Sequence, residues 1–167
     1  GPKRDFEEVL SRVGTEMLQL KPGSRFFTAA PIYHPAPSTL TSAALVTPGV
    51  STFVAPKFDP ESFLATIEAQ RITHIYLVPT MMSRMLKLPE EARQRDDLSS
   101  HRIAIHAAAP CPVPVKREMI EWWGPVLHEY YAGTEGNGFT MINSEEWLEA
   151  HRTAHGVGIA SNITIMF

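Results

Sequence analysis

Cysteine is nearly absent from this sequence, which contains a single residue of that type, Cys111. One cysteine cannot form an internal disulfide framework, so the class of small secreted proteins held together by disulfides is excluded. A lone thiol fits a reducing compartment, and we therefore predict a cytoplasmic location.

Long apolar runs and an excess of basic charge are also lacking. No run approaches the roughly 20 apolar residues that a membrane-spanning helix needs. The 15 lysines and arginines are outnumbered by 18 aspartates and glutamates, which gives a formal net charge of −3. We therefore expect neither a membrane span nor nucleic acid as a partner. Residues 1–8 lack the apolar region of a signal peptide.

The H-E-x-x-H motif of zinc enzymes is missing as well, so the sequence gives no support for a zinc site. Cys111 has no evident partner that would make it a nucleophile. His106 and His128 are weak candidates for chemistry, because a single histidine in a short motif is more often structural than functional.

What the sequence does contain is a regular alternation of strands and helices. Runs rich in β-branched and aromatic residues predict strands, and apolar residues three and four positions apart predict helices. Strands are expected at residues 25–32, 51–55, 73–78, 102–105 and 126–130. Such alternation is typical of α/β proteins, so we predict an open parallel sheet of about five strands with helices on both faces.

The chain divides into three parts on this prediction. Residues 1–24 form an N-terminal helix and turn, residues 25–140 a parallel α/β nucleotide-binding subdomain, and residues 141–167 a short helix and the start of a further, truncated subdomain. Asp59, Thr80 and Ser144 are the predicted N-caps of three helices. The charged segment 89–100 is predicted to be a solvated excursion.

Ligands of open parallel sheets bind outside the carboxyl ends of the strands, and segment 131–136 follows the last predicted strand. Its small residues leave the backbone accessible, and Thr134 offers a hydroxyl and an N–H to a phosphate oxygen. Glu135 offers a carboxylate that suits Mg²⁺, and Tyr131 a flat ring that can stack on a purine. An ordinary turn with a solvated glutamate explains the same residues about equally well.

Two further segments follow predicted strands. Segment 107–110, Ala-Ala-Ala-Pro, has side chains small enough for a flat ring to lie against the main chain, although a tight turn before a helix is the simpler interpretation. His34 lies between prolines after the first strand, where it could orient a carboxylate and titrate near neutral pH. A loop histidine is more often a plain surface residue.

Taken together, these segments resemble the adenylate-forming acyl-activating superfamily of acyl-CoA synthetases, aryl-CoA ligases, luciferases and peptide-synthetase adenylation domains. Segment 31–34 is similar to the family's P-x-[FY]-H, segment 107–110 to its adenine segment, and segment 131–135 to its Y-G-x-T-E signature. The resemblance runs from about residue 6 to residue 167 and is closest to fatty-acid CoA ligases. It identifies the chain as a fragment of the family's N-terminal domain.

The resemblance implies a role for each matching residue. Thr134 would contact the α-phosphate, Glu135 would hold Mg²⁺, and His34 would sit at the gate of the acyl pocket; these three are the predicted catalytic residues. The substrates would be ATP, a carboxylic acid of fatty-acid type and CoA. The predicted nucleotide-binding residues are Ala107, Ala108, Ala109, Pro110, Glu129, Tyr130, Tyr131, Ala132, Gly133 and Thr134.

Several family features are missing from the sequence. It has no Ser/Thr/Gly-rich phosphate loop, no ribose-binding T-G-D segment after Gly158, and no C-terminal domain with its catalytic lysine. We therefore expect the isolated chain to be inactive, and to self-associate if truncation exposes apolar surface. The alternatives are a stand-alone α/β module that binds a nucleotide or a partner without catalysis, and a flavodoxin-like flavin binder.

Overall fold

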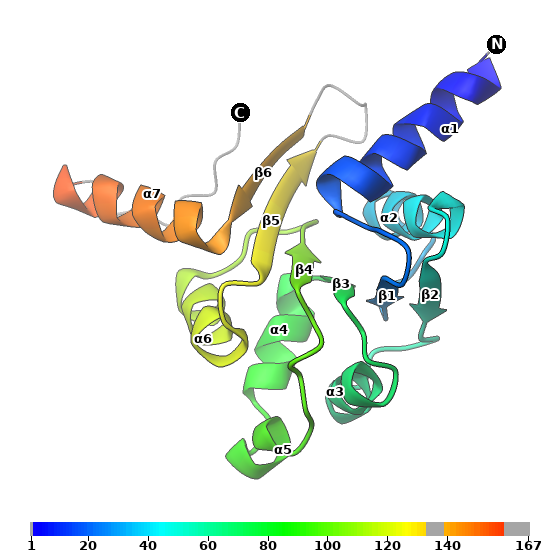
Figure 1. Ribbon diagram of the computed structural model, residues 1–167. Helices are drawn as coiled ribbons and strands as arrows, with labels where there is room; N and C mark the ends of the chain where they lie inside the picture. The colour runs from blue at the N-terminus through cyan, green and yellow to red at the C-terminus, as the bar shows by residue number, and fades with distance from the viewer. Residues whose placement is uncertain (1, 133–138, 159–167) are drawn as a thin grey trace.

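A six-stranded sheet forms the centre of the protein, in the order β2-β1-β3-β4-β5-β6 (Figure 1). The computed structural model describes residues 2–132 and 139–158. The first five strands in chain order pair in parallel, and β6 pairs with β5 in the antiparallel direction. The predicted open parallel α/β sheet is thus confirmed, with one antiparallel strand added at its edge.

The strands and helices of the described residues have the following bounds. The strands are β1 (Arg25–Thr28), β2 (Ser51–Val54), β3 (His74–Leu77), β4 (Ile103–His106), β5 (Leu127–Ala132) and β6 (Phe139–Asn143). The helices are α1 (Pro2–Arg12), the π-helical turn η1 (Val13–Met17), α2 (Pro35–Val46), α3 (Pro60–Ala69), α4 (Pro79–Leu86), α5 (Glu90–Gln94), α6 (Val113–Trp123) and α7 (Ser144–Gly156).

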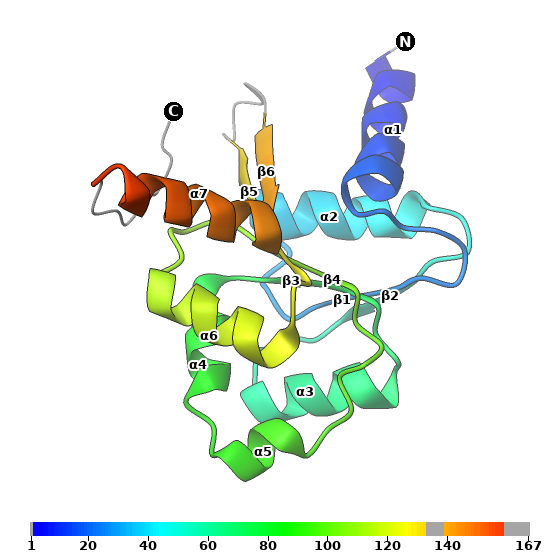
Figure 2. The same ribbon diagram turned by 60° about the vertical axis from the view of Figure 1, so that its left-hand side comes forward.

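Helices cover both faces of the sheet. Figure 2 shows α1 and α2 on one side and α3, α4 and α6 on the other. The chain leaves β1 towards β2 on one side and then returns to β3 on the other, so the direction of winding reverses between β1 and β3. In open α/β sheets, a crevice for ligands forms at such a reversal.

The central strands are buried on both faces, as parallel strands between two helical layers must be. All four residues of β3 and all four of β4 are buried. The largest fully buried side chains include Tyr76, Phe26 and Phe27, and the ring of Phe27 stacks on that of Phe63 in α3. This rigid core fixes the positions of the loops at the carboxyl ends of the strands.

Helix α3 begins as the sequence predicts. The carboxylate of Asp59 accepts a hydrogen bond from the backbone N–H of Ser62 at 2.9 Å, and Pro60 occupies the first turn. Phe63, Leu64 and Ile67 then face the core at spacings of one and three residues. The cap and the apolar stripe both indicate a helix that begins at residue 60, which is why this element was predictable.

The two other predicted N-caps are wrong. Helix α4 begins at Pro79 with Val78 in the cap position, so Thr80 is inside the helix. Asn143 caps α7 through a capping box with Glu146, and Ser144 is the first helical residue. The Ser144 hydroxyl instead donates to the carbonyl of Leu127 at 2.8 Å, a buried contact that competes with a capping role.

Several predicted strand ends also need correction. β1 ends at Thr28 rather than at residue 32, and the chain then enters α2 at Pro35, because proline is well suited to the first turn of a helix. β5 continues through Tyr131 and Ala132, since β6 pairs with it up to Ala132. The segment 89–100 contains the short helix α5. The proposed division at residue 140 falls within β6 and stays a prediction.

Candidate functional site

The carboxyl ends of four neighbouring strands lie along one edge of the sheet. The order β1-β3-β4-β5 sets them side by side, with Thr28 opposite Tyr76, Leu77 opposite His106, and His106 opposite Glu129. Segment 31–34 follows β1, segment 107–110 follows β4, and residues 129–132 end β5. The parallel register therefore brings these predicted residues to the same edge of the sheet.

The loop after β4 has an unusual backbone. Ala107 is buried, whereas Ala108, Ala109 and Pro110 are exposed. Ala108 has φ = 73°, in the left-handed region that costs an L-residue roughly 1–2 kcal/mol. Strained residues cluster at functional sites, and this one turns an accessible stretch of backbone along the sheet edge. That is the surface against which a flat ring could lie.

Strand β5 contains four of the predicted nucleotide-binding residues, Glu129, Tyr130, Tyr131 and Ala132. Tyr131 is 47% exposed, so its ring is open to a stacking partner. Tyr130 projects to the other face of the strand, and burial raises the pKa of its hydroxyl. The backbone of Ala132 ends β5. The predicted residues Gly133, Thr134 and Glu135 lie outside the described residues, so the predictions made for them stay predictions.

Glu129 forms a short ion pair that the sequence did not reveal. Its Oε2 lies 2.6 Å from Nζ of Lys116, which is fully buried in α6. Lys116 lies on the same stripe of α6 as Met119 and Trp123, at spacings of three and four residues. A lysine on the apolar stripe of a predicted helix needs a buried acid as its partner, and this signal could have identified Lys116.

His106, the last residue of β4, is fully buried beside this pair. Its Nε2 lies 3.9 Å from Oε2 of Glu129, and neither ring nitrogen has a hydrogen-bond partner among the described residues. Burial, and secondarily the positive charge of Lys116, lower the pKa of His106 to about 3. The ring is therefore neutral at pH 7, and the contact with Glu129 is not an ion pair.

Cys111 lies in the same neighbourhood. Burial raises the pKa of its thiol to about 12, with a smaller lowering by Lys116 and a smaller raising by Glu129. The thiol is thus protonated at neutral pH, which agrees with the prediction that it is not a nucleophile.

His34 occupies the N-cap position of α2 without forming a side-chain cap. It is exposed, and its ring packs against that of Tyr33 with 4.6 Å between centroids. It follows β1, which two strands, β3 and β4, separate from β5 and its Glu129. The role predicted for His34 stays a prediction.

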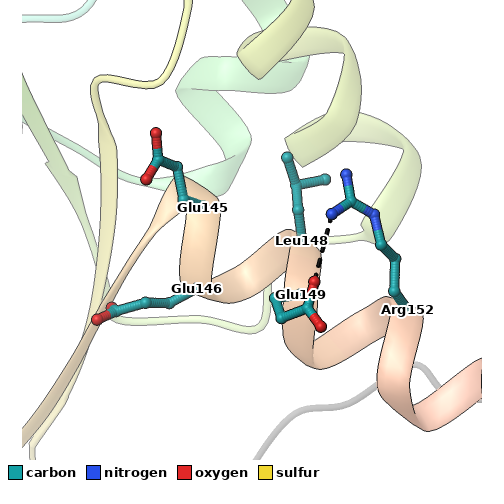
Figure 3. A pocket seen from close by; sticks show the side chains of 5 residues that line it. All are labelled: Glu145, Glu146, Leu148, Glu149 and Arg152. Carbon is teal, nitrogen blue, oxygen red and sulfur yellow. Dashed lines mark hydrogen bonds and ion pairs between the residues drawn. The ribbon is translucent and has the colours of Figure 1, made fainter.

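No group of three or more metal-ligating side chains gathers within the part of the chain that the structure describes. His151 and His155 lie one turn apart on α7, with 5.9 Å between ring centroids, and have no third partner there. Figure 3 shows a shallow hollow along α7 that holds none of the predicted site residues; Glu145, Glu146, Leu148, Glu149 and Arg152 line it. None of the described helices is long and apolar enough to cross a membrane.

Comparison with known proteins gives a consistent family. The sequence model of the AMP-binding enzyme family matches residues 7–165. A medium/long-chain-fatty-acid–CoA ligase, FadD8 of Mycobacterium tuberculosis, is 35% identical over 111 residues, which are 66% of this chain and 19% of the relative. The putative acyl-CoA synthetase YngI of Bacillus subtilis is 32% identical over 65% of this chain and 20% of its own length. The chain spans about a fifth of the length of these relatives.

Solved structures agree with the sequence relatives. The amide bond synthetase McbA of Marinactinospora thermotolerans superposes with a TM-score of 0.76 and 25% identity, over 89% of this chain and 29% of that one. The ATP-bound MatB of Rhodopseudomonas palustris superposes with a TM-score of 0.69 and 27% identity, over 83% of this chain and 27% of that one.

Proposed function

Because the chain belongs to the AMP-binding enzyme family, we propose that it supplies the adenine-binding edge of an ATP-dependent acyl-CoA ligase. The observation that carries the proposal is the pairing of two features at neighbouring strand ends. After β4, Ala108 has a left-handed backbone conformation, and the exposed backbone of this turn lies at the sheet edge. The half-exposed ring of Tyr131 lies on the neighbouring strand, β5. A purine between a flat backbone and a tyrosine ring is the ligand that this geometry suits.

The proposed reaction joins a carboxylic acid to CoA in two steps. The carboxylate oxygen attacks the α-phosphorus of ATP and pyrophosphate leaves, which forms an acyl-adenylate. The CoA sulfur then attacks the acyl carbon, and AMP leaves. The protein's main contribution to both steps is positioning and stabilisation of charge on phosphate. We propose a fatty acid as the carboxylic substrate, since the relative FadD8 carries that substrate class in its name.

Each predicted residue has a place in this proposal. Ala107 to Pro110 and Tyr131 would hold the base, with Glu129 and Tyr130 at its edge. Thr134 would donate to the α-phosphate, and His34, across the sheet reversal, would border the acyl group. The crevice at that reversal gives the second reactant a position next to the nucleotide.

Magnesium is the metal that the family resemblance implies. A carboxylate is the hard oxygen ligand that Mg²⁺ prefers, and Glu135 is the carboxylate proposed for it. The described residues contain no cluster that would serve instead. Bound Mg²⁺ would offset negative charge on the phosphates.

The test is ATP–pyrophosphate exchange by the protein expressed from the complete reading frame that contains this chain. We expect exchange that depends on added medium- or long-chain fatty acid. Replacing Glu135 by glutamine removes the anionic ligand while keeping its size, so kcat should fall by at least about 10²-fold, comparable to the loss of one stabilising group in other active sites.

Glu149→Gln on the exposed side of α7 is the matched control, because it makes the same chemical change away from the sheet edge. It should keep wild-type exchange. Absence of exchange with every carboxylic acid tried would contradict the proposed ligase and favour a non-catalytic module. Wild-type exchange by the Glu135→Gln variant would contradict the metal assignment alone.

Two weaker expectations complete the proposal. Apolar side chains are exposed on α1 and α2, namely Phe6, Val9, Leu45 and Val46, which supports the expected self-association of the isolated chain. The cytoplasmic location predicted from the single cysteine stays a prediction.

A further inference from the structure

Lys116 is the most unusual buried residue outside the predicted site. Its side chain is fully buried in α6, and its ammonium donates to Oε2 of Glu129 at 2.6 Å. The ring of Trp147 in α7 covers it, with Nζ 4.8 Å from the ring centroid. The lysine is thus enclosed between α6, β5 and α7, at the point where α7 packs on the sheet.

The fold itself does not require a charge at this position. Burial lowers the pKa of Lys116, which is the mark of a desolvation cost, and the charge and hydrogen bond of Glu129 oppose it, with a smaller contribution from Cys111. A methionine would fill a similar volume on the stripe with Met119 and Trp123 without that cost, and replacing buried ion pairs by apolar groups is often neutral or stabilising. The ion pair therefore points to a task for the carboxylate.

The surroundings of Glu129 leave Lys116 as the group that orients it. His106 is neutral and 3.9 Å away, and the thiol of Cys111 is protonated. Among the described residues, the hydrogen bonds of the Glu129 side chain run through Oε2 alone. Yet 30% of this side chain is exposed, while the ammonium that holds it is fully buried. The Glu129 side chain is therefore held at Oε2 and remains partly accessible to solvent.

Glu129 lies on the strand next to the turn proposed to hold the base. Glu129 pairs with His106 across the sheet, and the backbone turn at 107–110 begins at the next residue. An adenine edge presents an amino donor where guanine presents a carbonyl acceptor. A carboxylate accepts from the amino group and repels the carbonyl, because an ionised carboxyl group can only accept hydrogen bonds.

We propose that Lys116 is a positioning residue for base selection: it holds Oε2 of Glu129 so that the other carboxylate oxygen accepts a hydrogen bond from the amino group of adenine. This inference rests on the proposed function and extends it. Without the ammonium, Glu129 can rotate away from the base, and its carboxylate then no longer repels a guanine carbonyl. Lys116 would thereby favour adenine over guanine nucleotides without touching either.

The test measures exchange with ATP and with GTP in the protein from the complete reading frame. In the Lys116→Met variant we expect KM for ATP to rise about tenfold, kcat to stay within about twofold, and the preference for ATP over GTP to fall at least tenfold. Lys87→Met is the matched control, because Lys87 is exposed after α4, and it should keep wild-type values. Circular dichroism of both variants checks the fold.

A second variant separates positioning from a merely structural role. In a Glu129→Gln background the amide has no charge for Lys116 to hold, so adding Lys116→Met should change the ATP-to-GTP preference by less than about twofold. Wild-type KM and base preference in Lys116→Met, or equal loss of preference in both backgrounds, would overturn the inference. If Lys116→Met does not fold, the folded Glu129→Gln variant remains as a test. Loss of the preference for ATP over GTP in that variant would support the inference, and an unchanged preference would overturn it. Wild-type protein without any exchange would instead contradict the proposed ligase.

Discussion

His74 and His106 are buried in the sheet as neutral rings, and this makes the fold sensitive to acid. Burial lowers the pKa of His74 to about 4 and that of His106 to about 3, both below the ordinary 6.5. Below pH 6.5 the unfolded chain therefore binds more protons than the folded one. The stability that these rings provide is fully present above pH 6.5 and is lost as pH falls towards 4 and 3.

We expect the free energy of unfolding to fall by about 1.4 kcal/mol per pH unit for each of the two histidines between pH 6 and pH 4.5. Urea denaturation at several pH values measures this slope. A His74→Leu variant should show a shallower slope, while His34→Leu, at an exposed position, should keep that of the wild type. Identical slopes in His74→Leu and wild type would show that His74 does not take up a proton on unfolding.

The π-helical turn η1 packs on α2 through a glycine. A Cβ added to Gly14 would lie 2.3 Å from Oγ1 of Thr47 and 3.2 Å from the carbonyl oxygen of Ala43. Those two atoms are already joined by a 2.7 Å hydrogen bond that the Thr47 hydroxyl donates. The contact leaves room for a hydrogen atom only, so the sequence needs glycine here for close approach rather than for backbone freedom.

We expect Gly14→Ala to lower the free energy of unfolding by about 1–3 kcal/mol, the usual cost of overpacking a tight contact. Chemical denaturation measures it. Gly156→Ala makes the same change at the end of α7, where an added Cβ meets nothing within 4 Å, so it should be neutral or slightly stabilising. A wild-type stability for Gly14→Ala would mean that α2 moves away from η1 without loss.

Elements with one strong local signal were predictable, and those decided by tertiary packing were not. Asp59, Pro60 and the apolar stripe after them predict α3 from local chemistry alone. β6 was missed because Thr140 and Asn143 weaken its apolar pattern, although the turn-prone Gly136-Asn137-Gly138 before it is a hairpin signal. Ser144 was mistaken for a cap because its hydroxyl bonds to Leu127, a partner 17 residues away.

The same division holds for the candidate site. Segments 107–110 and 131–135 were proposed from residue types after strands, because the carboxyl ends of parallel strands lie along one edge of the sheet; of these, residues 107–110, 131 and 132 are described and lie at that edge. Lys116 could not be assigned a role in that way, because its meaning depends on a contact with Glu129 that joins α6 to β5. Nor does composition predict that Ala108 adopts φ = 73°, which the chain accepts only within the packed loop.

At the scale of the whole molecule, the described chain offers one edge of a sheet rather than an enclosed site. The proposed base-binding surface lies on that edge, whereas the phosphate loop, the ribose segment and the catalytic lysine of the family have no counterpart in these 167 residues. Loss of a single group that stabilises developing charge costs about 10²–10³ in kcat, and several are missing together. The isolated chain of 167 residues should therefore retain some binding of the nucleotide and lose catalysis.

We expect the isolated chain to bind AMP weakly and to catalyse no measurable ATP–pyrophosphate exchange, at least about 10³-fold below the protein from the complete reading frame. Isothermal titration with AMP measures the first property, and a radiolabelled exchange assay the second. Tyr131→Ala should abolish AMP binding if the exposed ring is the proposed stacking surface, whereas Tyr33→Ala, at a position 81% exposed after β1, should not. An exchange rate of the isolated chain within tenfold of that of the larger protein would mean that this sheet edge alone stabilises charge on the phosphates. The phosphate loop, the ribose segment and the catalytic lysine would then not be needed for formation of the acyl-adenylate.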